Sequence, residues 1–391
     1  MVGRERWRKS EEEGMSLIEL MVAVLIGVAV VAMAGTVLTG SNKASNTNSQ
    51  VAQTQQSARI AMDLLAEDLK IAGFGMTGTV GGCTRAIMPM DNVRTGALGA
   101  INDKGPDRVS LVLPFSSSIA PLWTIAAPQP QPNPLLPGFT NADITLTTGA
   151  VATIPASYTA ANSIFSLGGS FSGTVKSVAG DKITFNDPLG ATTLFPIGTR
   201  VYALQCITYQ IIAPPDTPRN VCGGTAPCLV RGAVAGLDCD IVASPCVPVA
   251  DGIEDLQIAY ACDGCVTATP NRVVDDIPGS AVVGFDSLDF VSNTDWATAP
   301  PWFATPLSTN TVRLARITVV ARETSPDLGV SEGSVPANNT STPLIIEDHN
   351  PANGVFIAPA GAGNDFSTTT YPLTQRRRVL TRTVETRNIG N

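Results

Sequence analysis

The chain has 391 residues, 33 acidic side chains against 25 basic ones, and a formal net charge of −8. This acidic balance argues against nucleic acid as a partner, and the length allows a large core in one elaborated domain or in two. With 35 glycines, 29 prolines and only 15% charged residues, the composition indicates short strands joined by long polar loops. Seven of the eight cysteines lie between Cys206 and Cys265, which indicates an oxidising, extracytoplasmic compartment.

The first predicted element is a membrane-spanning helix from Met15 to Leu38. These 24 residues carry one charge, Glu19, and no proline, and at 1.5 Å per residue they can cross a hydrocarbon core of about 30 Å. The apolar run continues into a longer helical pattern, so any cleavage is expected before the span. A carboxylate in such a run usually has a partner or a function. The alternative is an uncleaved signal anchor in which Glu19 lies at the interfacial end of the span.

The helical pattern continues to about Ala72, where Gly73 and Gly75 are expected to end it. One narrow face of its second half carries charged residues: Arg59, Asp63, Glu67 and Lys70. The broad remainder carries apolar residues: Ile60, Met62, Leu64, Leu65, Leu69 and Ile71. The second half is therefore expected to dock on a folded domain, with Gly35 and Gly40 as weak points between the halves.

From about Met76 the apolar period changes to two, which predicts strands. The predicted strands are "DRVSLVLPF" (107–115), "DITLTTG" (143–149), the hairpin "GTVKSVAGDKITFND" (173–187) turning at Gly180-Asp181, "TRVYALQCITYQII" (199–212), "DGIEDLQIAYAC" (251–262) and "NTVRLARITVVARE" (310–323). A stretch rich in Pro, Ala, Thr and Asn between Pro114 and Ile164 is predicted to be a long surface insertion.

At the N-terminus Gly14 precedes Met15, and Glu19 is the fifth residue after that glycine, inside the apolar run. This pattern resembles the type III signal of type IV prepilins. The resemblance implies cleavage after Gly14 by a prepilin peptidase, N-methylation of Met15 and an assembly role for Glu19. Pairing the new amine with Glu19, on the same or a neighbouring subunit, would neutralise a charge in the low-dielectric core of a fibre.

Two features depart from the family pattern. The leader "MVGRERWRKSEEEG" carries four basic and four acidic side chains, whereas family leaders are commonly basic. Met15 stands where the family often has phenylalanine. The arginines and the lysine of the leader still predict a cytoplasmic N-terminus, because acidic residues contribute little to orientation.

Later landmarks resemble PilW-type minor pilins: "QQSARIAMDLLAEDLKIAGFG…GGC", "VADGIEDLQIAYACD", "TVRLARITVVARE" and "RRRVLTRTVETRNIGN". The resemblance implies an α+β pilin-like fold, in which a long N-terminal helix packs on an antiparallel sheet with long disulfide-stapled loops. The expected segments are a leader (1–14), a membrane or fibre-core half-helix (15–38), an amphipathic half-helix (39–75) and a β-rich head (76–391) with insertions near 114–165 and 207–250.

The resemblance also implies a role: a structural subunit, not an enzyme, that primes pilus assembly and lies in or at the tip of the pilus. It implies neither a cofactor nor a metal. The implied partners are other minor pilins, the major pilin, the prepilin peptidase, the inner-membrane assembly machinery and a tip adhesin. The implied location is the inner membrane before assembly and the cell surface after it. Two alternatives stay open: a PulJ-like minor pseudopilin of type II secretion, and a signal-anchored adhesin or redox module.

The cysteines admit three interpretations. "CDGC" (Cys262 to Cys265) has redox spacing, and Cys222 and Cys228 could complete a zinc site with it. The oxidising compartment and the turn-forming Asp263-Gly264 favour structural disulfides. Eight cysteines allow 105 pairings, so the connectivity stays open. We expect Cys83 to pair with Cys206 and the other six to staple the 222–265 region; these are Cys222, Cys228, Cys239, Cys246, Cys262 and Cys265.

Three further motifs each have a functional interpretation and a simpler one. His349 could serve a catalytic triad, but no G-x-S-x-G accompanies it, so a loop histidine is expected. The acidic loop 348–365 lacks the ordered spacing of a calcium loop. The arginines near the C-terminus could bind DNA, although the alternating pattern around them favours an edge strand protected by charge. They are Arg376, Arg377, Arg378, Arg382 and Arg387.

Overall fold

The structure is a computed structural model. It describes residues 16–76, 78–80, 82–90, 106–115, 123–126, 143–150, 163–186, 195–212, 221–223, 226–232, 239, 246–264, 270–276, 284–285, 289–290, 312–324, 345–346, 366–367 and 377–387. The chain divides into two compact units, with the boundary between Val51 and Ala52. Each unit is described by itself below.

One long helix, α1 (Leu17–Ile71), begins in the first unit and ends in the second. It continues through Gly35 and Gly40, so the expected weak points do not interrupt it. As predicted, the helix ends before Gly73 and Gly75, which have φ angles of 78° and 66°. These left-handed conformations carry little strain in glycine, which is why the chain can leave the helix there.

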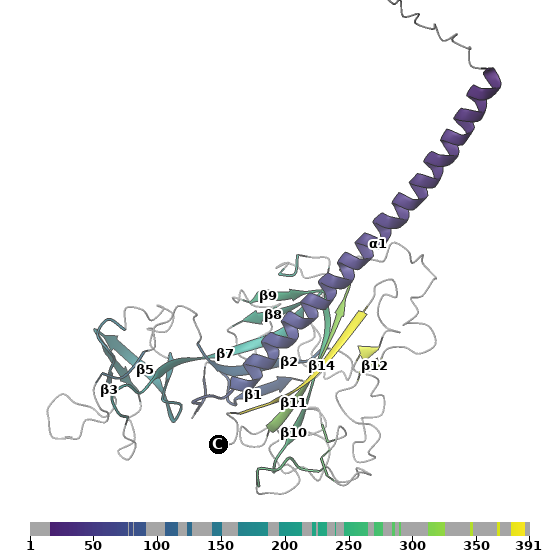
Figure 1. The fold of residues 1–391 in the computed structure, drawn as a ribbon. Helices are drawn as coiled ribbons and strands as arrows, with labels where there is room; N and C mark the ends of the chain where they lie inside the picture. Colours follow the sequence, from purple (N-terminus) through teal and green to yellow (C-terminus); the bar gives the residue numbers. More distant parts are fainter. Residues whose placement is uncertain are drawn as a thin grey trace, which may run out of the picture. The chain divides into compact units, whose positions relative to one another are not determined.

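Within its described residues, the second unit contains three antiparallel sheets (Figure 1). The nine-stranded sheet has the order β1 (Ile87–Met90), β2 (Arg108–Pro114), β7 (Val201–Ile212), β4 (Ile164–Leu167), β5 (Phe171–Ala179), β6 (Lys182–Phe185) and β3 (Asp143–Thr145); β8 (Cys228–Gly232) also pairs with β7, and β9 (Val247–Asp251) pairs with β8. The second sheet has the order β10 (Ile253–Cys262), β11 (Val312–Arg322) and β14 (Arg377–Glu385). The third pairs β12 (Ile345–Ile346) with β13 (Phe366–Ser367).

The main core lies between α1 and one face of the two larger sheets. Alternation along the strands places Leu111 and Leu113 of β2 on this face, together with Ile207 and Ile211 of β7. The second sheet contributes Ile258, Tyr260, Ile317 and Val319 to the same core. Asp107 links the two sheets, because its backbone N–H donates to Leu256 and its carboxylate accepts the N–H of Ile258. The α+β fold class expected from the sequence is therefore confirmed.

A second core lies in the lobe that the chain forms between β2 and β7. It is rich in aromatic side chains, with Trp123, Phe165, Phe185 and Phe195 buried among Ile125, Ile144 and Val201. The lobe joins the rest of the sheet through the first residues of β7, which pair with β4. The region near 114–165 was expected to be an insertion loop, yet its described residues include β3 and part of this core.

Most predicted strands are present, as β2, the β5–β6 hairpin, β7, β10 and β11. The hairpin turns at Gly180, which has a φ of 58°, and β14 is an edge strand, as expected. "DITLTTG" forms only the three-residue β3. The region near 207–250, expected to be a second loop insertion, contains the end of β7 together with β8 and β9. Their short segments "CLVRG" and "VPVAD" are interrupted by Gly, Pro and charge, so the alternation is too brief to identify them.

Candidate functional site: the N-terminal helix and its anchor on the sheet

Glu19 belongs to a capping box at the start of α1. The hydroxyl of Ser16 accepts the backbone N–H of Ile18 at 3.2 Å, and Oε2 of Glu19 accepts the N–H of Ser16 at 3.0 Å. This is the reciprocal S-x-x-E arrangement, which satisfies two backbone donors of the first turn. The sequence interpretation missed this role of Glu19, although the motif "SLIE" carries the signal for it. Among the described residues the carboxylate has no other partner.

The first half of α1 exposes a continuous apolar surface. Leu17, Leu25 and Val31 are each more than 70% exposed. One face of this segment is lined by Leu20, Met21, Val24, Leu25, Val28, Ala29 and Ala32. Within the described residues α1 is long and apolar enough to span a membrane. So large an apolar surface needs lipid or other protein around it.

The second half of α1 docks through a face of mostly small and aliphatic side chains. The buried residues are Thr54, Ala58, Ala61, Met62, Leu65, Ala66, Asp68 and Leu69, at helical spacing. Arg59, Asp63 and Glu67 are exposed, as expected for the charged face. Ile60 and Ile71, expected on the apolar remainder, are 45% and 39% exposed. Alanines allow the helix backbone to approach the sheet closely, so the contacting face is narrower than the apolar pattern suggests.

The buried carboxylate of Asp68 fixes the helix to two strands. Tyr209 of β7 donates its hydroxyl to Oδ2 of Asp68, and Arg231 of β8 donates to the same oxygen from Nε at 3.2 Å and Nη2 at 3.1 Å. Nε of Arg231 also lies 2.9 Å from the Tyr209 hydroxyl oxygen. Burial, and then the negative charge of Asp68, raise the pKa of Tyr209 above its ordinary value. The phenol therefore remains a neutral donor at physiological pH.

The residues just after α1 pack closely on the sheet. The N–H of Gly73 donates to the carbonyl of Val112 on β2 at 2.8 Å. The ring of Phe74 meets that of Tyr202 edge to face, with centroids 5.0 Å apart. A Cβ on Gly75 would collide with the side chain of Ser166 on β4. The motif "GFG" thus ends the helix and places it against both β7 and β4.

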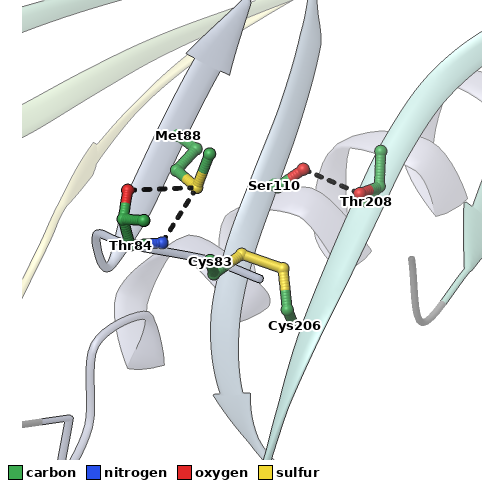
Figure 2. The surroundings of a disulfide bond; sticks show 6 residues. All are labelled: Cys83, Thr84, Met88, Ser110, Cys206 and Thr208. Atoms are coloured by element: carbon green, nitrogen blue, oxygen red, sulfur yellow. Dashed lines mark hydrogen bonds between the residues drawn. A yellow bond between two sulfur atoms is a disulfide. The ribbon is translucent and has the colours of Figure 1, made fainter. Parts of the chain in front are cut away.

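The Cys83–Cys206 disulfide lies on the opposite face of the sheet from α1 (Figure 2). Successive side chains of β7 point to opposite faces of the sheet, so Cys206 lies on the face away from Ile207 and Tyr209. On that face it packs with Leu204, Val112 and Val80. Two strand hydroxyls, Ser110 and Thr208, hydrogen-bond on this face at 2.7 Å. The pair is the one expected from the sequence, with a Cα–Cα distance of 5.8 Å. The helix and the loop after it therefore hold β7 from both faces.

The Cys222–Cys228 and Cys239–Cys246 disulfides belong to one small cluster with Ile212 and Val230. Leu229 faces the main core, so alternation places Cys228 and Val230 on the face opposite α1. Cys262 is also disulfide-bonded, while Cys265 lies outside the described residues. Three disulfides, Cys83–Cys206, Cys222–Cys228 and Cys239–Cys246, therefore staple the face of the sheet opposite α1, whereas Cys262 belongs to the main core.

The turn in "CDGC" is organised by the buried Asp263. Its carboxylate accepts the N–H groups of Asn271 and Arg272 at 2.8 and 2.7 Å, and it pairs with Arg313 at 3.0 Å. Gly264 has a φ of 91°. These contacts, together with the bonded Cys262, describe a structural turn. In the described part of the chain, no group of three or more His, Cys, Asp or Glu side chains could hold a metal ion.

Two of the C-terminal arginines bind carboxylates of the same chain. Arg377 of β14 is buried, and its Nε donates to Glu254 of β10 at 2.7 Å. Arg382 pairs with Asp63 of α1 at 2.8 Å on the surface. These contacts tie the edge strand β14 to the second sheet and to the helix, and they leave fewer arginines for a DNA-binding patch. Arg376 lies outside the described residues.

Several sequence expectations concern other residues outside the described part of the chain. These are the leader 1–14 with the cleavage glycine Gly14, the methylation candidate Met15, His349 and the acidic loop 348–365. The structure therefore places Glu19 but neither side of the predicted cleavage site.

No protein-family model matches the chain, and no curated protein matches it either. The structure is similar to the type IV-like pilin TTHA1219 from Thermus thermophilus, with a TM-score of 0.30 and 11% identity, over 86% of this chain and 98% of that one.

Proposed function

We propose that the chain is a minor pilin of the PilW type, a structural subunit that helps prime a type IV pilus and lies in it or at its tip. The observation that carries the proposal is the position of Glu19. It is the one charge in an exposed apolar half-helix, in the first helical turn and five residues after Gly14. A carboxylate inside a membrane-spanning segment usually has a functional role, because burying it in hydrocarbon is costly.

The capping box indicates how Glu19 could serve in pilus assembly. Cleavage after Gly14 would make Met15 the first residue, directly before the capping residue Ser16. One carboxylate oxygen of Glu19 is used by the Ser16 N–H, which leaves Oε1 to pair with a terminal amine on the same or a neighbouring subunit. In a low-dielectric environment such a pair removes the cost of an unpaired charge. Glu19 would then both begin the helix and set its register in the fibre.

The two halves of α1 suit the two stages of such a role. The apolar first half would lie in the inner membrane before assembly and against the helices of other pilins afterwards. The second half is fixed to the sheet by Asp68, the "GFG" motif and the following disulfide. The proposed partners are the major pilin and other minor pilins, a tip adhesin, the prepilin peptidase and the inner-membrane assembly machinery.

The nearest alternative is a PulJ-like minor pseudopilin of a type II secretion system. It would use the same N-terminus and differ only in its partners. Cross-linking in the native cell, followed by identification of the cross-linked proteins, separates the two: a pilus subunit captures the major pilin, and a pseudopilin captures secretion components. A signal-anchored redox module is less favoured, because the described cysteines are all in disulfides.

The proposal is tested first by the N-terminal residue and its mass. The full-length protein is expressed with a prepilin peptidase, as wild type and as Gly14→Ala. The expected wild-type product begins with N-methylated Met15, and the variant keeps its leader. An intact leader in both proteins would make the chain a signal-anchored protein and end the proposal.

A second comparison separates the two roles of Glu19. Glu19→Gln keeps an acceptor suited to the capping box but removes the charge, whereas Ser16→Ala removes the cap and keeps the charge. We expect Glu19→Gln to be processed normally and to fail in pilus incorporation, and Ser16→Ala to be incorporated. Normal incorporation of Glu19→Gln would show that the carboxylate serves only as a cap.

A further inference from the structure

Two methionines of the edge strand β1 accept hydrogen bonds through their sulfur atoms. Nε and Nη2 of Arg108, on the neighbouring strand β2, lie 3.2 and 2.8 Å from Sδ of Met90. The backbone N–H of Thr84 lies 3.3 Å from Sδ of Met88 (Figure 2). A thioether sulfur is a weak acceptor, whereas the guanidinium is a strong, charged donor. Arg108 therefore directs two strong donors at an atom that accepts them poorly.

Met90 is partly exposed, and its partner Arg108 is buried. β1 is the edge strand of the nine-stranded sheet, and Met90 is partly exposed. Arg108 is only 2% exposed and is paired directly with Met90 across the two strands. Met90 is thus the partner that solvent reaches, while the guanidinium beside it is buried.

We propose that Met90 is a site of oxidation to methionine sulfoxide, and that Arg108 binds the added oxygen so that the protein stays folded. The oxidant is a peroxide. A sulfur lone pair attacks one oxygen of hydrogen peroxide, and the S–O bond forms as the O–O bond breaks. The leaving hydroxide takes up the proton of the transferred oxygen, which gives the sulfoxide and water. The sulfur loses two electrons and the peroxide gains them.

The product suits the site better than the thioether does. A sulfoxide oxygen is a strong acceptor, and in most protein cores this new polarity is disruptive. Here the two N–H groups of Arg108 already point toward the sulfur. Met88 is a weaker version of the same arrangement, because its nearest donor is a neutral backbone N–H. Met62 of α1 offers the opposite case, since it is 5% exposed within the apolar main core.

Glutamine substitution tests the site without an oxidant, because the glutamine side-chain carbonyl stands in for the sulfoxide oxygen. In the full-length, disulfide-bonded protein in detergent, we expect Met90→Gln to keep the unfolding temperature within about 2 °C of wild type. Met62→Gln, the matched control, should lower it by about 5 °C or more, because it buries an amide in the apolar core. An equal loss in both variants would overturn the proposal.

Peroxide treatment tests the modification itself and does not depend on how the variants fold. Wild type and Met90→Leu are treated with hydrogen peroxide, digested and analysed by mass spectrometry, and their unfolding temperatures are measured. We expect about tenfold more sulfoxide at Met90 than at Met62, because oxidation follows exposure, and no fall in the unfolding temperature of wild type relative to Met90→Leu. Oxidation at Met62 before Met90, or a fall in wild type alone, would overturn the proposal.

Discussion

Tyr209 of β7 donates its hydroxyl to the carboxylate of Asp68, and that single bond links α1 to a strand 141 residues further along the chain. Arg231 completes the group from β8 and compensates the buried negative charge. Asp68 is 8% exposed, so water solvates it poorly and its two partners must replace the lost hydration. The helix is therefore docked by a charged cluster as well as by apolar contact.

The first prediction concerns that charge. Asp68→Asn keeps the shape of the side chain but leaves Arg231 without its anionic partner, and we expect the free energy of unfolding to fall by about 2–4 kcal/mol. Asp63→Asn is the matched control, because Asp63 forms a surface ion pair with Arg382 and should cost less than about 1 kcal/mol. Chemical denaturation of the full chain in detergent measures both. Equal losses would show that the buried cluster contributes no more than a surface pair.

The second prediction concerns the pH dependence of stability. The pKa of Tyr209 is raised in the folded protein, first by burial and then by Asp68, while in the unfolded chain it is about 10. Below pH 10 the phenol is protonated in both states, so its contribution is fully present; above pH 10 only the unfolded chain ionises, and stability falls by up to about 1.4 kcal/mol per pH unit. Tyr209→Phe should lack this component. Parallel pH curves for wild type and variant above pH 10 would contradict the assignment.

Local patterns predicted the elements that depend on local physics. Gly73 and Gly75 mark the helix end because few other residues adopt positive φ cheaply, and the hairpin at Gly180 follows from the same rule. The long strands β7, β10 and β11 show enough apolar alternation to be recognised. The assembly role of Glu19, which rests on its spacing from Gly14, stays a prediction.

Long-range partnerships explain what sequence reasoning missed. Asp68 looks like one more surface acid on a charged helix, and its partner Arg231 lies 163 residues away. Arg377 looks like part of a basic tail, yet it is buried against Glu254. The residues next to Asp68 or Arg377 in the sequence contain no signal that identifies the ionic partner. Only the folded topology shows that these charges are compensated.

The third prediction compares two disulfides. Removing Cys83–Cys206 as the double serine variant should cost about 4–5 kcal/mol, because it closes a loop with a sequence separation of 123. Removing Cys239–Cys246, with a separation of 7, should cost about 2–3 kcal/mol. Chemical denaturation of the oxidised proteins tests the order. The reverse order would mean that strain or residual structure, and not loop closure, decides the contribution of these bonds.

The fourth prediction concerns the close contact after the helix. Gly75 and Gly149 both have positive φ, 66° and 80°, so an alanine carries backbone strain of about 1 kcal/mol at either position. A Cβ at Gly149 meets nothing within 4 Å, whereas at Gly75 it collides with Ser166 and lies 3.1 Å from the Cα of Gly169. Gly75→Ala should therefore destabilise the fold by about 1–3 kcal/mol more than Gly149→Ala, because the β4–β5 turn must move away from the helix end. Thermal and chemical unfolding of both variants measure the difference, and limited proteolysis of the β4–β5 turn should show faster cleavage in Gly75→Ala alone. If the two alanines cost the same, the helix end and the turn are not in the tight contact on which the docking of α1 beside β4 depends.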